Sequence, residues 1–493
     1  MATKRIKVIG GGLAGPEAAL QAAKFGCEVD LYEMRPTRST EAHQTSDFAE
    51  LVCSNSLKSE SENTAPWLLK QEMRRAGSIL LTEADATAVP AGHALAVDRI
   101  EFSKRVAARI AAEPRITVHR EEVTTLNEND PNTITILATG PLTSPALAAE
   151  LQRLTGANHL AFYDSISPIV DATTIDMDKV YFAARWDKGT ADYINCPFTQ
   201  EEYDRFLDAL TTAEAVPAKS WEQIPTALQP NCHPERSGEA TESKDPEGAD
   251  SAKAFGQFST PTATQLHEPE KLQYFEGCLP IEETARRGRD TLRFGPMKPA
   301  GLTNPKTGKW PYAVVQLRQE NLRADSYNLV GFQNHLKYGE QSRVLRLIPG
   351  LENATFLRYG QIHRNTYIHA PSLLTETLQL KAHPTIMIAG QLSGVEGYTE
   401  SIASGMLAGR YAAAIAQGHT PTPAPRASAN GSLTHYITHA ETKKFQPANI
   451  TFDLLPPLEP ELRKKMRDKK ERHKLQCNRA LAAWDNWLAN DKT

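Results

Sequence analysis

The stretch IKVIGGGLAGPEAALQAAKFGCEVDLYE, residues 6–33, decides the fold. Its apolar start predicts a short strand over 6–9, and the alanine-rich segment after it predicts a helix closed by Gly26. A second strand is expected over 28–33, ending in the acid Glu33. A strand, a glycine-rich turn, a helix and a second strand in this order indicate a βαβ unit that binds a dinucleotide.

The glycines of this turn have separate steric roles. Gly10 permits the tight turn, Gly12 lets the backbone approach a pyrophosphate, and Gly15 allows the helix to pack closely on the strand. Phosphates are expected at the helix N-terminus, and Glu33 is placed to accept hydrogen bonds from ribose hydroxyls. The candidate cofactor-binding residues here are Gly10, Gly11, Gly12, Leu13, Ala14, Gly15 and Glu33.

Two later stretches indicate which dinucleotide binds. TITILATG, residues 133–140, predicts a strand ending at Gly140, and residues 385–409 predict a strand, a turn containing Gly390 and Gln391, and a helix of small residues. A domain that binds only a nicotinamide cofactor does not need this second turn. In a two-part flavin domain, the second helix directs its positive N-terminal end at the isoalloxazine ring. FAD is therefore expected, and a purely structural glycine turn is the alternative.

The order of these segments predicts an α/β protein with a split Rossmann-like FAD-binding domain. Its two parts are expected at 1–140 and 331–420. An inserted α+β substrate domain is expected at 141–330, and a linker with a basic helical tail at 421–493. Within the inserted domain, residues 229–264 are rich in Pro, Ser, Gly, Glu and Thr, which predicts a disordered insertion.

Composition restricts the class of protein. The 493 residues predict two or three domains, and 40% hydrophobic with 23% charged residues is ordinary for a soluble globular protein. The net charge of −4 is carried by residues 235–250, so local basic patches remain possible elsewhere. No signal peptide and no membrane span are expected, and we predict a cytoplasmic protein.

The six cysteines are scattered without CxxC spacing, which favours reduced thiols over a disulfide framework or a zinc site. Cys27 is expected in the core, Cys196 in a loop and Cys477 in the tail helix. The pair Cys232–His233 has no further ligands nearby in the sequence, and no metal site is predicted.

Two cysteines stand in unusual surroundings. Cys53 lies in LVCSNSLKS, residues 51–59, where apolar residues suggest the end of a strand or helix and the polar run suggests a loop. Cys278 precedes Arg286, Arg287 and Arg289, and nearby arginines stabilise the thiolate that acts as a nucleophile. The ordinary alternatives are a small core residue at Cys53 and arginines that face solvent near Cys278.

Two polar segments each have a functional and a structural interpretation. Residues 463–474 carry eight Lys or Arg against two acids, which indicates either a solvated helix face or contacts to RNA phosphates. His363, Arg364 and Asn365 interrupt apolar runs. They are expected either to face the flavin or substrate or to cap a turn.

The motifs GGGLAGPEAA, YEMRP, ELVCSNSLKS, FEGCLPIEE, DTLRFGPMKPAGL, GQLSGVEGYTESIASG and LLPPLE together resemble the folate- and FAD-dependent tRNA (uracil-5-)-methyltransferases, the TrmFO family. The resemblance extends to about residue 485 and departs from the family at 229–264. The dinucleotide motif and YEMRP are shared with the related GidA-type wobble-uridine enzymes. ELVCSNSLKS and FEGCLPIEE are more specific to the methyltransferases.

The resemblance implies a reaction. Thiolate addition at uracil C6 makes C5 nucleophilic, 5,10-methylenetetrahydrofolate supplies the carbon, and FAD, recharged by NADPH or NADH, supplies a hydride. The target is the T-loop uridine at position 54 in the tRNA T-arm. Cys278 becomes the expected nucleophile and Cys53 its flavin-side partner, although the two roles are open to exchange. The implied RNA contacts are Arg286, Arg287, Arg463, Lys464 and Lys465.

Two rival functions remain open from sequence. One is GidA-type modification of the wobble uridine, and the other is a non-catalytic FAD-bound protein that binds RNA.

Overall fold

The computed structural model describes residues 4–40, 42–156, 160–187, 189–216, 279–442, 445–466 and 468–490. At 160–165, 362–364 and 463–465 it describes the backbone alone. Cys278, Cys232 and the predicted insertion 229–264 lie outside the described residues.

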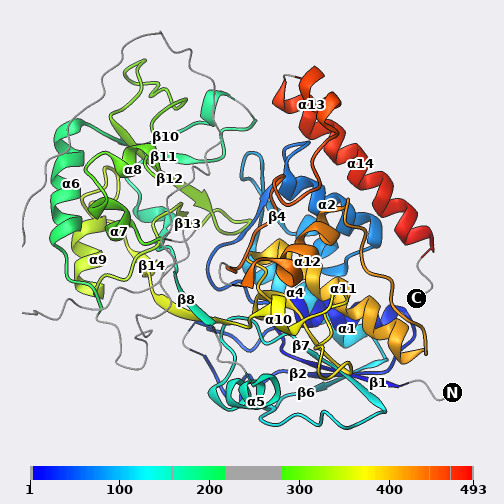
Figure 1. The fold of residues 1–493 in the computed structure, drawn as a ribbon. Helices are drawn as coiled ribbons and strands as arrows, with labels where there is room; N and C mark the ends of the chain where they lie inside the picture. The colour runs from blue at the N-terminus through cyan, green and yellow to red at the C-terminus, as the bar shows by residue number, and fades with distance from the viewer. Residues whose placement is uncertain are drawn as a thin grey trace, which may run out of the picture. The chain divides into compact units, whose positions relative to one another are not determined.

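A five-stranded parallel sheet contains the N-terminal motif (Figure 1). Its order is β16 (Ile386–Ile388), β7 (Thr133–Leu137), β1 (Arg5–Ile9), β2 (Val29–Tyr32) and β6 (Ile116–His119). Helix α1 (Ala14–Lys24) connects β1 to β2, which confirms the predicted βαβ unit. The late strand β16 pairs with β7, so the two distant parts of the chain share one sheet, as the split arrangement requires.

Helix α11 (Tyr398–Ala416) packs along α1 (Figure 1). A Cβ atom on Gly405 would lie 2.3 Å from the carbonyl oxygen of Ala14, and one on Gly409 would lie 2.4 Å from that of Ala18. These distances are shorter than van der Waals contact. The small residues that the sequence places in this helix therefore permit the two helix backbones to approach closely.

A six-stranded antiparallel sheet forms a second core. Its order is β10 (Tyr181–Phe182), β11 (Ile194–Phe198), β12 (Ala313–Gln319), β13 (Ser326–Leu329), β9 (Ile169–Asp171) and β14 (Phe356–Arg358). It packs with helices α6 (Gln200–Thr212), α7 (Ile281–Arg286), α8 (Thr291–Phe294) and α9 (Tyr338–Leu345). Cys196, expected in a loop, is instead fully buried in β11 because its side chain alternates into this core.

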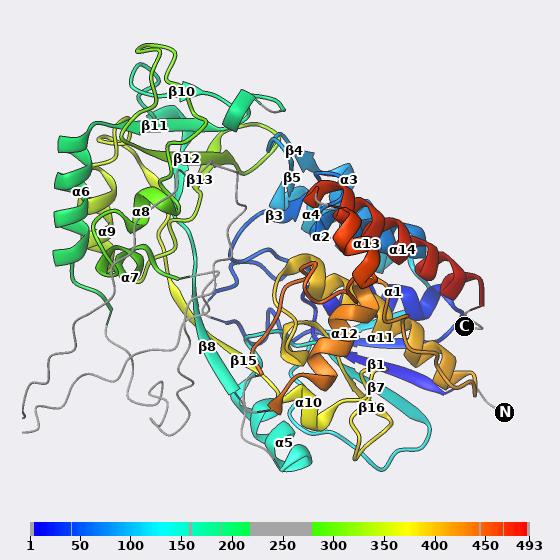
Figure 2. The same ribbon diagram turned by 45° about the horizontal axis from the view of Figure 1, so that its top comes forward.

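Strands β8 (Leu160–Ser165) and β15 (Ile362–Tyr367) form a two-stranded antiparallel ribbon (Figure 2). His363, Arg364 and Asn365 lie inside β15, opposite Asp164, Tyr163 and Phe162. Turn capping at these positions was therefore a wrong expectation. The polar residues do not break the strand because cross-strand backbone pairing continues through them.

A three-stranded sheet in the order β3 (Ser56–Ser59), β5 (Ala94–Val97), β4 (Ala88–Val89) precedes helix α4 (Arg99–Ala112). The remaining helices in the first core are α2 (Ala65–Ala76), α3 (Ile79–Ala86), α5 (Pro145–Thr155), α10 (Ala370–Leu373) and α12 (Ala429–His439).

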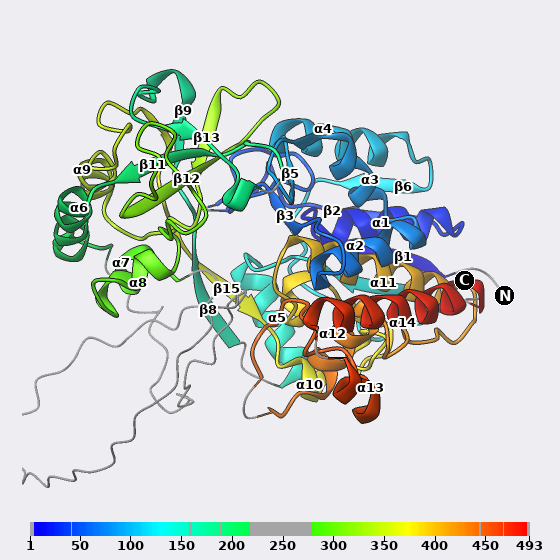
Figure 3. The same ribbon diagram turned by 90° about the horizontal axis from the view of Figure 1, so that it is seen from above.

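The tail contains helices α13 (Pro460–Lys465) and α14 (Lys469–Asn490). Helix α14 packs against α2 (Figure 3), where the indole nitrogen of Trp484 donates to the carbonyl of Glu72 at 2.7 Å. Cys477 is buried in this helix, as expected for a tail-helix cysteine. Within the described ranges, no helix is both long and apolar enough to cross a membrane.

Candidate functional site

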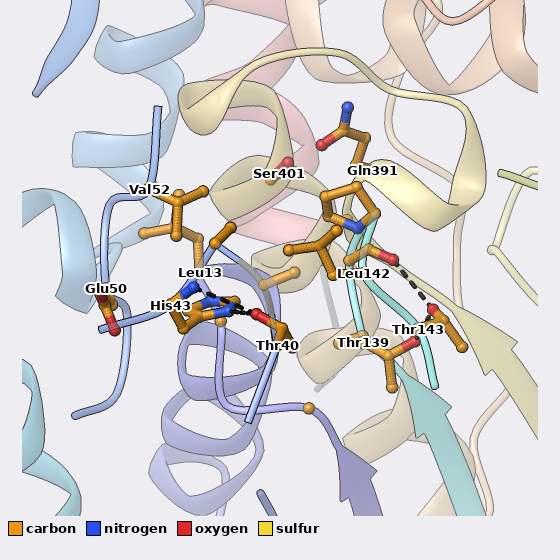
Figure 4. Close-up of a pocket in the computed structure, with 18 of the residues that line it drawn as sticks. Leu13, Thr40, His43, Glu50, Val52, Thr139, Leu142, Thr143, Gln391 and Ser401 are labelled. Atoms are coloured by element: carbon orange, nitrogen blue, oxygen red, sulfur yellow. Dashed lines mark hydrogen bonds between the residues drawn. The ribbon is translucent and has the colours of Figure 1, made fainter. Parts of the chain in front are cut away.

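A cavity of about 340 Å³ opens where the parallel strands end (Figure 4). Residues one or two positions after the ends of β1, β2, β6, β7 and β16 line it, which is where open α/β sheets bind ligands. The predicted residues that line it are Gly10, Gly11, Gly12, Leu13, Ala14, Glu33, Cys53, Gly140, Gly390, Gln391 and Asn365. The cavity thus joins both glycine-rich turns to the first of the two singled-out cysteines.

The first turn has the shape that its glycines predict. Gly10 has φ +118°, and a Cβ on Gly15 would lie 1.8 Å from the carbonyl oxygen of Gly10. A Cβ on Gly12 meets nothing within 4 Å, although the residue lines the cavity. Gly10 and Gly15 are therefore required by the protein itself. Gly12 is not, and its position on the cavity leaves open space for a ligand to approach the backbone.

The acid at the end of the second strand is held in place. The carboxylate of Glu33 accepts a hydrogen bond from the backbone N–H of Gly11 at 2.8 Å. It also accepts hydrogen bonds from the backbone N–H and the Nε–H of Arg35, both at 2.9 Å. Burial alone would raise its pKa, but hydrogen bonds and charge from Arg35, with the N–H of Gly11, lower the pKa below its ordinary value. The carboxylate is ionised at neutral pH and lies beside the turn.

The second turn is organised by hydrogen bonds from α11 and its own loop. Gly390 donates its N–H to Ser404 at 2.8 Å, and the side-chain amide of Gln391 donates to Glu396 at 2.6 Å. Gly397 and Tyr398, where α11 begins, also line the cavity. The positive end of this helix therefore faces the cavity, as the sequence predicts for a flavin domain.

Cys53 lies on the cavity in a loop, and the local structure is the reverse of the expected one. Leu51–Cys53 is irregular, whereas the polar SLKS segment forms strand β3. Leu51 and Leu57 are buried and hold the segment in the core. Between them, the side chains of Ser54 and Asn55 make tertiary hydrogen bonds. Residues 56–59 contain a single apolar residue, Leu57, so they give no periodic signal for a strand.

Two side chains from distant helices fix the Cys53 backbone. The hydroxyl oxygen of Tyr398 accepts the N–H of Cys53 at 2.7 Å and that of Ser54 at 3.2 Å. Arg99 donates to the carbonyl of Leu51 at 2.7 Å and to that of Cys53 at 3.5 Å. Burial, with the charge of Cys53 next, raises the pKa of Tyr398, so its phenol stays neutral.

The same loop is fastened to the second core. Arg318 in β12 donates to Ser54 Oγ at 2.7 Å and to Asn55 Oδ1 at 3.0 Å. Asn55 is fully buried and donates in turn to the carbonyls of Val97 and Gln319. The SNS segment is therefore a cross-link between two cores, a role that no local pattern in the sequence reveals.

Lys58 is a cavity residue that the sequence analysis missed. Its ammonium group lies 2.6 Å from Glu400 and donates to Asn449 Oδ1 at 3.0 Å. The three residues lie far apart in the chain, which explains why no motif connects them. His43 was missed as well: its Nδ1 is 2.6 Å from the hydroxyl of Thr40 (Figure 4). Burial and the charge of Arg35 lower the pKa of His43 to about 4.

Of the predicted RNA-contact residues, Arg286 and Arg287 have described side chains, and neither lines the cavity. Arg286 forms an ion pair with Glu283 on α7, and Arg287 is exposed after that helix. Arg463, Lys464 and Lys465 end helix α13, and their side chains are not described. The basic residues Lys469, Lys470 and Lys474 of α14 are exposed, while the buried face of α14 begins at Cys477.

Comparison with known proteins agrees with this geometry. The family model described as "Glucose inhibited division protein A" matches residues 5–243 and 240–420. Two solved structures of Aquifex aeolicus GidA align with TM-scores of 0.64 and 0.65 at 16% and 15% identity. They cover 99% of this chain and 74% and 77% of theirs, so they show a shared fold.

Sequence relatives are much more similar. A protein from Koribacter versatilis named methylenetetrahydrofolate–tRNA-(uracil-5-)-methyltransferase TrmFO is 62% identical over 99% of both chains. A protein of the same name from Solibacter usitatus is 56% identical over 98% of this chain and 99% of its own. Another, from Enterococcus faecalis, is 50% identical over 97% of both chains.

Proposed function

Because the chain belongs to the TrmFO family of methylenetetrahydrofolate–tRNA-(uracil-5-)-methyltransferases, we propose that it methylates C5 of a tRNA uridine with 5,10-methylenetetrahydrofolate as the carbon donor. The observation that carries this proposal is one cavity that joins a dinucleotide-binding turn to Cys53. Full-length identity of 62% to a protein of that name supports the same reaction.

The cavity residues fit FAD. Gly12 leaves open space where a pyrophosphate approaches the N-terminus of α1, and the ionised Glu33 lies beside it as an acceptor for ribose hydroxyls. Gly390, Gln391 and the N-terminus of α11 line the rest of the cavity, where a flavin ring would lie. Bound FAD would supply the hydride that brings a methylene carbon to the methyl level.

The protein's own contribution is two thiols and their supports. In our proposal the thiolate of Cys278 adds to C6 of uracil, and C5 forms a bond to the one-carbon unit. Loss of the C5 proton breaks the bond between this carbon and its carrier amine, and once a hydride has reduced the resulting exocyclic methylene, C6 expels the thiolate. Cys53 acts on the cofactor side, with the guanidinium groups of Arg99 and Arg358 within electrostatic range. Tyr398 and Arg318 position the loop that carries it.

The finer assignments rest on the resemblance. We propose the T-loop uridine at position 54 as the target, and NADPH or NADH as the reductant that recharges FAD. Arg286, Arg287 and the basic α13–α14 segment, including Arg463, Lys464 and Lys465, are proposed to contact the T-arm. The domain limits 1–140, 141–330, 331–420 and 421–493 likewise remain our proposal.

Nucleoside analysis tests the function directly. Unmodified tRNA is incubated with the protein, methylenetetrahydrofolate and NADPH, and its nucleosides are measured by mass spectrometry. We expect 5-methyluridine that disappears when the folate is omitted. A larger substituent on the wobble uridine would favour GidA-type chemistry instead, and absence of any modified nucleoside with FAD bound would favour a non-catalytic RNA-binding protein.

A further inference from the structure

Two histidines and a glutamate converge on the surface where α12 meets the segment after α10. His435 and His439 are one helical turn apart, and their imidazole rings stack with centroids 4.3 Å apart and planes 14° apart. Glu376 Oε1 lies 3.0 Å from Nδ1 of His435 and 3.6 Å from Nδ1 of His439. One carboxylate oxygen therefore faces two imidazole nitrogens.

The backbone on both sides of this group is held by other contacts. At the start of α12, the carboxylate of Glu72 accepts the N–H groups of Ala429 and Asn430 at 2.7 and 2.9 Å. In the turn that carries Glu376, Thr375 and Gln379 are joined by a backbone hydrogen bond of 3.0 Å. The three donor side chains thus project from elements that other hydrogen bonds also hold.

The separations match those of ligands around one small ion. A metal bound at about 2.0–2.1 Å to each donor in tetrahedral geometry sets ligand atoms about 3.3 Å apart. The two distances from Glu376 Oε1 lie on either side of this value, and donor atoms of all three residues lie within 4.8 Å of one another. Because the two rings are stacked, an ion bound to both nitrogens requires the ring planes to rotate until both in-plane lone pairs point at it.

We propose that Glu376, His435 and His439 bind one divalent transition-metal ion of the zinc class. Two imidazoles and one carboxylate suit Zn²⁺, Co²⁺, Ni²⁺ or Cu²⁺, whereas Mg²⁺ and Ca²⁺ prefer oxygen ligands throughout. The side chains are 41%, 37% and 51% exposed, so a water molecule can take the fourth position. This assignment departs from the sequence analysis, which predicted no metal.

Other contacts of these residues compete with metal binding, and the experiment must distinguish the two. Without metal, the same residues form a hydrogen-bonded group, and the hydroxyl of Thr438 lies 2.9 Å from Nδ1 of His439. The positive charge of Arg426 also acts on Glu376, although its guanidinium donates to Ser432 at 2.7 Å. Metal binding requires His439 to exchange its contact with Thr438 for the ion.

The position of the cluster indicates a structural ion. It would join α12 to the turn that precedes β16, and β16 leads directly into the Gly390 turn of the cavity. A ligand that binds only the folded chain stabilises it. Zinc should therefore raise the melting temperature of the protein. None of the three residues lines the cavity, so the ion would not contact a ligand bound there.

The test uses the full-length flavin-bound protein after treatment with a chelator. ZnCl₂ affinity is measured by competition with a chromogenic chelator, and CoCl₂ binding by visible d–d absorption. The variants are His435→Ala, His439→Ala, Glu376→Gln and the double histidine variant, and the matched control is His419→Ala on an exposed histidine outside the cluster. No variant changes a cysteine, so zinc binding by thiols contributes equally to every protein compared. A difference in zinc affinity between variants is therefore due to the Glu376–His435–His439 cluster.

We expect each cluster variant to bind zinc at least tenfold more weakly than the wild type, and the zinc-induced rise in melting temperature to vanish in the double variant. The His419→Ala control should behave like the wild type. Equal zinc affinity in the wild type and the double variant overturns the proposal, as does a wild type whose melting temperature zinc does not raise. Flavin absorbance and the zinc-free melting temperature verify folding, and His439→Gln replaces any alanine variant that fails this check.

Discussion

The hydroxyl oxygen of Tyr398 lies 2.7 Å from the backbone nitrogen of Cys53 and accepts its N–H, although 345 positions separate the two residues. It also accepts the N–H of Ser54 at 3.2 Å. The N-terminus of α11 therefore fixes the loop that carries the thiol. This contact links the helix that follows the second glycine-rich turn to the proposed chemistry.

Tyr398→Phe should lower methylation at least tenfold while FAD stays bound. The substitution leaves two half-buried N–H groups without their acceptor, at a cost of about 1–3 kcal/mol, so the loop moves. Turnover is measured by the nucleoside assay and FAD by its absorbance. The matched control is Tyr436→Phe, which loses a hydroxyl contact to the carbonyl of Gln446 remote from the cavity lining. Equal turnover in both variants would remove Tyr398 from the positioning role.

Gly12→Arg should abolish FAD binding without unfolding the protein. A side chain at Gly12 meets no protein atom within 4 Å, so the folded chain tolerates it, but it fills the space of the pyrophosphate. Flavin absorbance and circular dichroism give the two readouts. Gly339→Arg is the control because Gly339 is exposed and a Cβ there also meets nothing within 4 Å. A yellow, folded Gly12→Arg protein would contradict the assigned site.

His43 should make the fold sensitive to acid. Its pKa is about 4 in the folded chain and about 6.5 when unfolded, so the unfolded state binds more protons between these values. His43 therefore does not change the free energy of unfolding above pH 6.5. As the pH decreases from 6.5 to 4, this free energy falls by up to about 3 kcal/mol. Urea unfolding at several pH values measures this fall, which should be smaller in His43→Gln. An identical pH profile in both proteins would show that His43 does not carry the effect.

The basic end of α14 should contribute phosphate contacts to tRNA. Neutralising Lys469, Lys470, Arg472 and Lys474 removes up to four contacts, and each should reduce the slope of log affinity against log salt by somewhat less than one unit. Binding is measured by filter retention over a salt series. The control neutralises four bases elsewhere: Lys104, Arg115, Arg153 and Arg323. If the two quadruple variants have the same slope, the tail is a solvated helix face.

Short sequence patterns predicted the features of the fold that are determined by residues close together in the chain. Gly10 and Gly15 indicated the turn between β1 and α1 because the steric limits on both glycines are set by residues within a few positions. Helix α6 likewise begins with a local signal, the capping box of Thr199 and Glu202. Cys196 was misplaced because its burial depends on β12, more than a hundred residues later in the chain.

Residues of the site could be predicted only where a short sequence motif contained them. The cavity brings Gly12, Cys53 and Gly390 together, and each had been singled out from its own short motif. Tyr398 and Lys58 were inside quoted motifs but had no assigned partner, since hydrogen bonds between elements leave no periodic trace in one sequence.

Trapping with a fluorinated substrate tests the two-thiol mechanism. If Cys278 adds to uracil C6, T-arm RNA containing 5-fluorouracil should form a covalent adduct, because fluorine at C5 cannot leave as a proton does and the thiolate is not expelled. Cys278→Ala should give no adduct and no methylated product while retaining FAD. Cys53→Ala should lose turnover yet retain the adduct if its role is on the cofactor side. The assay is denaturing electrophoresis of each variant with RNA, folate and NADPH, and Cys196→Ala serves as the thiol control because that side chain is fully buried away from the cavity lining. An adduct that survives in Cys278→Ala but disappears in Cys53→Ala would exchange the two roles, since the nucleophile is the thiol without which no bond to C6 forms.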